Sequence, residues 1–261
     1  MASDKKFAVL IDADNVSDKY IKFILDEVTN DGIATYKRIY GDWTSPALVS
    51  WKKVLLDHSV MPIQQYSYTS GKNSTDSAMI IDAMDILYSG QVDGFCLVSS
   101  DSDFTRLAAR LRESGMLVVG MGERKTPKSF ISACNRFKYL DILANSESKT
   151  KSKLDMQFGQ MEKSKNYMLP LESEHVKEDM TNIKTIEDAI RAIAEEYSDE
   201  DEWIFTGTIG NLLVKRYPDF DVRNFGYRKL TAFLEALDLF DIKKVRTGDG
   251  DAKLIYVKLK N

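Results

Sequence analysis

The feature that most constrains the fold is a regular alternation of short apolar runs with segments of helical periodicity. The run FAVLID, residues 7–12, precedes a segment whose apolar side chains recur every three or four residues. The same pattern continues to residue 122, with predicted strands at 34–41, 60–68, 95–100 and 117–122 and predicted helices at 20–29, 46–56, 75–88 and 104–113. Because parallel strands need right-handed crossovers, this series predicts an α/β fold with helices on both faces of a central parallel sheet.

The expected strand order is 3-2-1-4-5, which makes the first and fourth strands neighbours at the point where the winding direction reverses. Open α/β sheets place their binding sites beyond the carboxyl ends of the strands at such a point. Polar residues at these two strand ends are therefore the first to consider as functional residues.

The second half of the chain has a different organisation. Residues 145–181 are rich in Ser, Lys and Asn without a sustained period, which predicts a linker between a domain at 5–144 and one at 182–261. The later segment predicts helices at 186–197, 207–216 and 227–237, and a hairpin at 241–259 around a Gly-Asp-Gly turn. Three helices followed by a hairpin suggest a small winged-helix domain.

Composition narrows the classes of function. A net charge of −4 and a pI of about 5.4 exclude a protein that coats nucleic acid by bulk electrostatics, so a polyanion would have to meet a local basic patch. The two cysteines lack the spacing of a zinc site or a disulfide framework. The first residues hold too short an apolar stretch for a signal peptide, and no run reaches the ~20 residues that span a bilayer. A cytoplasmic protein without a membrane partner is expected.

Carboxylates follow the ends of the two strands expected to be neighbours. Asp12 closes the first strand, with Asn15 just beyond it, and Asp101 and Asp103 follow the fourth. Asp76 lies at the start of a predicted helix, on the same side of the sheet. Three separate segments thus bring acidic side chains to one edge.

Clustered carboxylates repel one another unless a cation or protons neutralise them. A hard divalent ion, Mg²⁺ or Mn²⁺, takes oxygen ligands and supports hydrolysis of a phosphodiester. The only histidines, His58 and His175, lie outside any credible Ser-His or Cys-His pair. Local roles remain open, because Asp103 is also suited to cap the helix at 104–113 and Asn15 to make a turn.

With these residues in place, the first domain resembles the NYN family of PIN-like nucleases. The matching stretches are LIDADN, YGDW, and residues 62–90 and 97–115. The resemblance implies a PIN-like three-layer sandwich and a divalent-metal ribonuclease site with Asp12, Asp76 and Asp101 as metal ligands. It also implies that Asp103 and Asn15 belong to the catalytic centre. Some relatives have glycine where this chain has Asp14, so the resemblance does not decide whether the site binds one metal ion or two.

Substrate contacts must come from positive or polar side chains around the acidic centre. The residues proposed to hold RNA phosphates, single-stranded RNA being the expected substrate, are Arg38, Lys72, Asn73, Arg124, Lys125 and Lys128. The run at 124–128 is the densest basic loop on the expected carboxyl side of the sheet.

The second domain resembles the OST-HTH, or LOTUS, winged-helix family through Trp203, residues 208–237 and the terminal hairpin. Members of that family bind RNA or helicase partners, so the resemblance implies recruitment of RNA or of a protein partner. The residues expected to form an RNA-binding face are Lys215, Arg216, Arg223, Arg228 and Lys229, with Tyr227 for base stacking.

Two alternative functions stay open at this point. One is a non-catalytic RNA-binding or regulatory adapter that keeps the acidic pocket. The other is a phosphatase of the haloacid-dehalogenase kind, with Asp12 as nucleophile and Asp14 as general acid. That reading leaves Asp76 unexplained and expects an inserted cap, whereas the chain after Asn15 passes directly into a helix.

Overall fold

A computed structural model describes residues 4–66, 74–146, 180–246 and 253–260. Lys72, Asn73, residues 147–179 of the predicted linker and the predicted Gly-Asp-Gly turn lie outside the described residues. The N-terminal region, residues 4–146, and the C-terminal region, residues 180–260, each have their own hydrophobic core.

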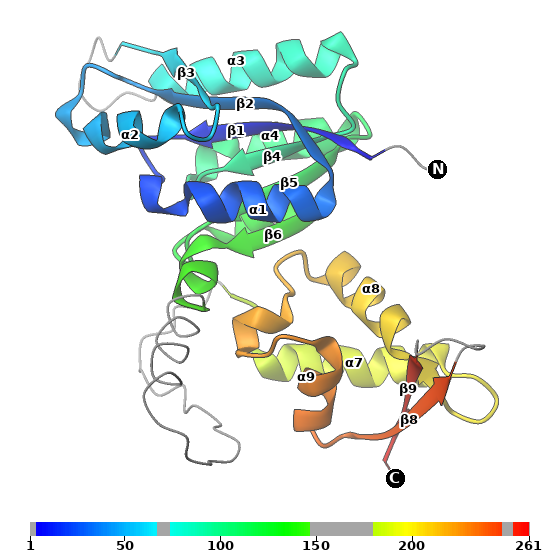
Figure 1. The fold of residues 1–261 in the computed structure, drawn as a ribbon. Coiled ribbons are helices and arrows are strands. Elements are labelled where there is room, and N and C mark those ends of the chain that lie inside the picture. Colours follow the sequence, from blue (N-terminus) through cyan, green and yellow to red (C-terminus); the bar gives the residue numbers. More distant parts are fainter. Residues whose placement is uncertain (1–3, 67–73, 147–179, 247–252, 261) are drawn as a thin grey trace, which may run out of the picture.

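The N-terminal region is built on a parallel six-stranded sheet of order β3-β2-β1-β4-β5-β6 (Figure 1). The strands are β1 (Lys6–Asp12), β2 (Ile33–Gly41), β3 (Met61–Gln64), β4 (Gly94–Val98), β5 (Leu117–Gly122) and β6 (Arg136–Tyr139). The predicted parallel sheet is confirmed, including the neighbouring first and fourth strands. The sixth strand, at the β5 edge, was not predicted.

The central strands are buried on both sides, because helices cover both faces of the sheet. In β1, Phe7, Val9 and Ile11 point into one core and Ala8 and Leu10 into the other. The first core takes side chains from α1 (Ile21–Asp31) and α2 (Lys52–Leu55), and the second from α3 (Ser74–Ser89), α4 (Thr105–Glu113) and α5 (Lys128–Ala133). The result is the expected three-layer sandwich (Figure 1).

One predicted helix differs in its local geometry. The segment expected as a helix over 46–56 is a 3₁₀ helix at Pro46–Trp51 followed by the short α2. Ser45 caps it by accepting a hydrogen bond from the Ala47 N–H, and Pro46 occupies the first turn, where a missing N–H costs nothing. Leu48 and Trp51, three residues apart and therefore eclipsed on a 3₁₀ helix, are both buried.

The C-terminal region contains three helices and a small antiparallel sheet. Its elements are α7 (Ile183–Tyr197), β7 (Ile204–Phe205), α8 (Thr206–Arg216), a 3₁₀ helix (Val222–Phe225), α9 (Leu230–Ala236), β8 (Phe240–Arg246) and β9 (Lys253–Leu259), with strand order β7-β9-β8. The predicted helices and hairpin are confirmed, except that the third begins at Leu230 because the chain first makes the 3₁₀ turn and a left-handed Gly226. No helix in the described ranges combines the length and the apolarity that a membrane crossing needs.

Candidate acidic site at the carboxyl edge of the sheet

The carboxyl ends of β1 and β4 place the predicted acidic residues at one edge of the sheet. Asp12 is the last residue of β1, Asp101 follows β4, and Asp76 lies in the first turn of α3. Oxygens of Asp76, Asp101 and Asp103 all lie within 4.8 Å of one another. Within the described part of the chain, this is the group of acidic, histidine or cysteine side chains with the spacing of a metal site.

Asp12 lies beside this group and is held by hydrogen bonds. Its Oδ2 accepts from the Ser99 hydroxyl at 2.7 Å and from the Asn15 amide at 2.8 Å, and its Oδ1 accepts from the Asp14 N–H at 3.1 Å. The side chain is buried, and burial raises the pKa of Asp12 although the donors from Ser99 and Asn15 act to lower it. These bonds fix the orientation of the carboxylate.

Ser99 connects the two strand ends. Its hydroxyl donates to Asp12 and accepts a hydrogen bond from the Asp101 N–H at 3.1 Å, and the residue is fully buried. Gly122, at the end of β5, permits this packing, because a Cβ there would lie 2.6 Å from the Ser99 carbonyl oxygen. The carboxyl end of β4 therefore packs closely against the ends of both neighbouring strands, β1 and β5.

Asp101 also shapes the turn that carries Asp103. Its Oδ1 accepts from the Asp103 N–H at 2.9 Å, which makes Asp101 the cap of the 3₁₀ helix Ser102–Phe104. The sequence suggested Asp103 for the capping role, and the structure gives it to Asp101. The turn brings the second acid of the pair round to the same group of oxygens.

The acidic side chains act strongly on Asp76. Burial, and then the charges of Asp12, Asp101 and Asp103, raise the pKa of Asp76 to about 6. A carboxylate that resists ionisation beside other carboxylates gains from a cation that neutralises the group. The arrangement thus supplies oxygen ligands and a reason to bind a positive ion.

The basic loop after β5 lies at the same edge, and two of its cations have acidic partners. The Arg124 Nε is 3.0 Å from an Asp141 carboxylate oxygen, and the Lys125 Nζ is 3.0 Å from Glu123. Lys128 is exposed at the start of α5. These loop residues remain predicted phosphate contacts.

Arg38 has a different environment. Its guanidinium bonds to Asp82 of α3, which also accepts from the Tyr40 hydroxyl, and it lies over the Tyr36 ring at 5.2 Å. The residue therefore ties β2 to α3, and it belongs to a different set of contacts from the acidic group. Its predicted role in substrate binding has no contact here to support it.

Glu123 is a residue at this edge that the sequence reasoning missed. It accepts a hydrogen bond from the Tyr20 hydroxyl at 3.0 Å, and its N–H donates to the Ser100 hydroxyl at 2.9 Å. Burial acts to raise the pKa of Glu123, but the bonds to Lys125 and Tyr20 leave it lowered. The sequence does contain a signal for Glu123, because this residue directly follows a predicted strand, just as Asp12 closes one.

The basic residues that the sequence suggested for an RNA-binding face of the C-terminal region differ in their contacts and exposure. Arg216 pairs with Glu196, and Arg223 bonds to Glu27 and Asp221. The Tyr227 ring packs edge-on against Phe233 at 5.5 Å, so it belongs to the rim of the core. The exposed basic side chains of the predicted face are Lys215, Arg216, Arg228 and Lys229, whereas Arg223 is half-buried.

Replacing Ser99 with alanine is expected to lower the free energy of unfolding at pH 7 by about 1–2 kcal/mol. The buried Asp12 carboxylate would lose one of its donors and its pKa would rise further. Urea unfolding followed by circular dichroism measures the loss. Ser89→Ala, which removes an exposed hydroxyl bonded to the Ile86 carbonyl, is the matched control. Equal losses in the two variants would contradict the bridging role of Ser99.

Comparison with known proteins relates the chain to two domain families. A family model for the NYN domain matches residues 6–141, and one for the OST-HTH/LOTUS domain matches residues 181–250. The solved structure of a protein of unknown function from Vibrio parahaemolyticus is 21% identical, with a TM-score of 0.45, over 53% of this chain and 94% of its own. Comparison with curated protein sequences finds no match.

Proposed function

We propose, from the premise that this chain belongs to the NYN domain family, that it is a divalent-metal-dependent ribonuclease that hydrolyses RNA phosphodiester bonds. An NYN domain of the PIN-like nuclease superfamily followed by an OST-HTH/LOTUS domain indicates an RNA-related nuclease. The observation that carries the finer proposal is the group of three carboxylate oxygens, from Asp76, Asp101 and Asp103, within 4.8 Å of one another.

The donor set fits a hard cation. All three ligands are carboxylate oxygens, which Mg²⁺ and Mn²⁺ prefer, and Mg²⁺ in proteins keeps several waters beside one or two carboxylates. Asp76, Asp101 and Asp103 would hold the ion, with Asp12 next to them. When bound, such an ion activates a water and stabilises the charge that develops on the phosphodiester.

The side chains around the ion have separable tasks in this proposal. Asn15 and Ser99 orient Asp12 through hydrogen bonds of 2.8 and 2.7 Å, which fix the position of its carboxylate. Asp103, an exposed member of that group, is placed on the solvent side, where it would orient the attacking water. The catalytic residues are then Asp12, Asp76, Asp101 and Asp103, with Asn15 as a positioning residue.

Substrate binding is assigned to two surfaces. Lys125, Arg124 and Lys128 follow β5 at the edge that carries the acids, and they would hold phosphates of single-stranded RNA. In the C-terminal domain, the exposed Arg228 and Lys229 would bind RNA or a protein partner. A cytoplasmic setting, where RNA is available, belongs to the same proposal.

The test is cleavage of labelled single-stranded RNA and DNA by the purified chain in Mn²⁺, Mg²⁺ or EDTA. Metal-dependent RNA cleavage that is lost in Asp12→Asn supports the ribonuclease. RNA binding without cleavage in either metal would favour the adapter, and a phosphorylated Asp12 would favour the phosphatase. DNA cleavage at the same rate would overturn the assignment of RNA.

Metal binding is expected to raise the melting temperature, and by more at pH 7 than at pH 5. The pKa of Asp76 is raised to about 6 in the folded chain, so between its ordinary value and that value the folded state binds more protons than the unfolded state. The metal-free protein therefore loses stability as the pH rises through this window. A cation replaces the proton above pH ~6, and an ion at a hundred times its Kd adds about 2.7 kcal/mol.

Thermal melting with and without Mn²⁺ at the two pH values measures this effect. The double variant Asp76→Asn/Asp101→Asn is expected to lose the Mn²⁺-dependent shift. Asp85→Asn, an exposed aspartate on the same helix α3, is the control that keeps it. A shift of the same size in the double variant would mean that Mn²⁺ binds elsewhere.

A further inference from the structure

The C-terminal domain lies against the outer edge of β6, the last strand of the large sheet (Figure 1). The Phe137 N–H on that edge donates a hydrogen bond of 2.7 Å to the Pro218 carbonyl oxygen. Edge strands carry unpaired backbone groups that favour association unless another segment covers them. Here the segment that covers β6 belongs to the chain's own second domain.

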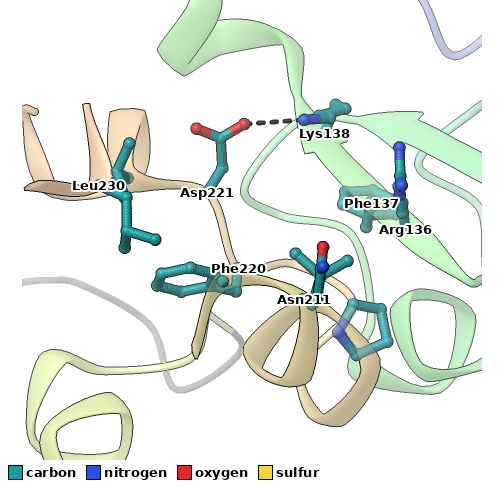
Figure 2. Close-up of a pocket in the computed structure, with 11 residues that line it drawn as sticks. Arg136, Phe137, Lys138, Asn211, Phe220, Asp221 and Leu230 are labelled. Atoms are coloured by element: carbon teal, nitrogen blue, oxygen red, sulfur yellow. Dashed lines mark hydrogen bonds and ion pairs between the residues drawn. The ribbon is translucent and has the colours of Figure 1, made fainter. Parts of the chain in front are cut away.

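Four charged side chains meet beside this contact, one acid and one base from each domain. Arg223 donates to both oxygens of Glu27, at 2.5 and 2.9 Å. The Lys138 Nζ lies 2.8 Å from an Asp221 oxygen (Figure 2). The side chains of Glu27 and Asp221 are only 10% and 12% exposed, so these pairs are shielded from solvent. A two-pronged pairing between an arginine and a carboxylate has a defined geometry as well as a favourable energy.

The charges of this cluster depend on one another. Burial acts to raise the pKa of Asp221, yet the bonds to Arg223 and the nearby Lys138 hold it well below its ordinary value. Arg223 also bonds to Asp221 within its own domain, at 2.7 Å. The four side chains sum to zero charge, which allows them to be buried together, whereas removal of one member leaves a buried charge without compensation.

A second set of contacts ties the start of the C-terminal domain to the same place. The Asp219 carboxylate accepts from the Tyr139 hydroxyl of β6 at 3.1 Å and from the Thr181 N–H and hydroxyl at 2.9 and 2.7 Å. Met180 packs against the core of the N-terminal domain. The chain therefore already contacts the first domain where it enters the second, which favours docking within one molecule.

We propose that the C-terminal domain is docked in a fixed orientation on β6 and α1 of the same molecule, through the cluster of Glu27, Lys138, Asp221 and Arg223. The contact between the domains consists of separate polar interactions. It leaves a cavity of about 270 Å³ between β6 and α8, lined among others by Phe137, Asn211 and Phe220 (Figure 2). An interface of this kind is sensitive to a single reversed charge.

The docking has a consequence for nucleic-acid contacts. Arg223 and Lys138 are used to hold the domains together, which removes Arg223 from the basic face that the sequence suggested. The exposed Arg228 and Lys229 are then fixed in position relative to the acidic edge of the sheet. The docking itself does not depend on the proposed ribonuclease activity.

The experiment measures the distance between spin labels on the two domains of the full chain by pulsed electron paramagnetic resonance. Lys53→Cys and Glu195→Cys place the labels at exposed positions, while Cys96 and Cys134 are buried and stay unlabelled. A single narrow distance distribution is expected. Arg223→Glu, which sets a third acid beside Glu27 and Asp221, is expected to abolish that narrow peak.

Arg216→Glu is the matched control, since it makes the same change in a solvent-exposed pair of the C-terminal domain and should keep the peak. Lys138→Glu reverses a charge from the opposite side of the interface and must also abolish the peak, with folding of each variant checked by circular dichroism. A broad distribution in the parent protein overturns the proposal. So does a narrow peak that survives both reversals, or one that disappears on dilution with unlabelled chain because a dimer has exchanged subunits.

Discussion

Replacing Asp101 with asparagine is expected to lower the rate of metal-dependent RNA cleavage about a thousandfold, on the order of 4 kcal/mol of transition-state stabilisation. Asp101 belongs to the group of three carboxylates and follows the end of β4, where its backbone N–H donates to the Ser99 hydroxyl. Asparagine keeps an oxygen that can accept from the Asp103 N–H, so the capped turn is retained while the charge is lost.

Single-turnover cleavage of labelled RNA at saturating Mg²⁺ measures the rate, with Asp85→Asn as a control that makes the same chemical change at an exposed position of α3. Since the variant weakens the affinity for the cation, its rate should continue to rise with Mn²⁺ over concentrations at which the parent enzyme is already saturated. A cleavage rate within tenfold of the parent's rate would contradict the assignment of Asp101 to the catalytic centre.

The central part of the fold follows from sequence pattern because it rests on burial. In β1 residues 7–11, and in β4 residues 95–98, face the two cores in alternation, which appears in the sequence as an unbroken apolar run. The strand β6 gave no such run. Its sequence, RFKY, alternates basic and aromatic residues because Arg136 and Lys138 pair with Asp31 and Asp221.

The acidic edge was also predictable, for a topological reason. Carboxyl ends of neighbouring parallel strands share one edge, so Asp12 and Asp101 had to approach each other once β1 and β4 were neighbours. The partners of the basic loop were not predictable in this way. Arg124 meets Asp141, seventeen residues later, through the return of the chain along β6.

Contacts between the domains have no local signature at all. Glu27 and Arg223 are separated by 196 positions, and each belongs to a segment that reads as an ordinary solvated surface. Arg223 was expected on a nucleic-acid-binding face for that reason. Only the tertiary arrangement shows that its guanidinium is directed at a buried carboxylate.

Replacing Arg223 with methionine is expected to lower the free energy of unfolding by roughly 2–3 kcal/mol at pH 7, below the range for a fully buried pair because the side chain retains some solvent contact. Methionine keeps the apolar stem but removes both hydrogen-bond donors to Glu27, and Lys138, at 2.8 Å from Asp221 and 3.7 Å from Glu27, is left as the cation for both acids. Urea unfolding measures the change. Arg216→Met, in an exposed pair with Glu196, should cost no more than about 0.5 kcal/mol.

The origin of the loss is tested by adding Glu27→Gln. If the cost of Arg223→Met comes from the loss of both hydrogen-bond donors to the Glu27 carboxylate, neutralising that carboxylate should recover part of the stability, and the double variant should lose less than the sum of the single losses. Additive losses would mean that the two residues act independently, and docking would then rest on Asp219, Tyr139 and the β6 edge. Because Glu27 and Arg223 belong to different domains, a non-additive result would also show that the two domains are energetically coupled.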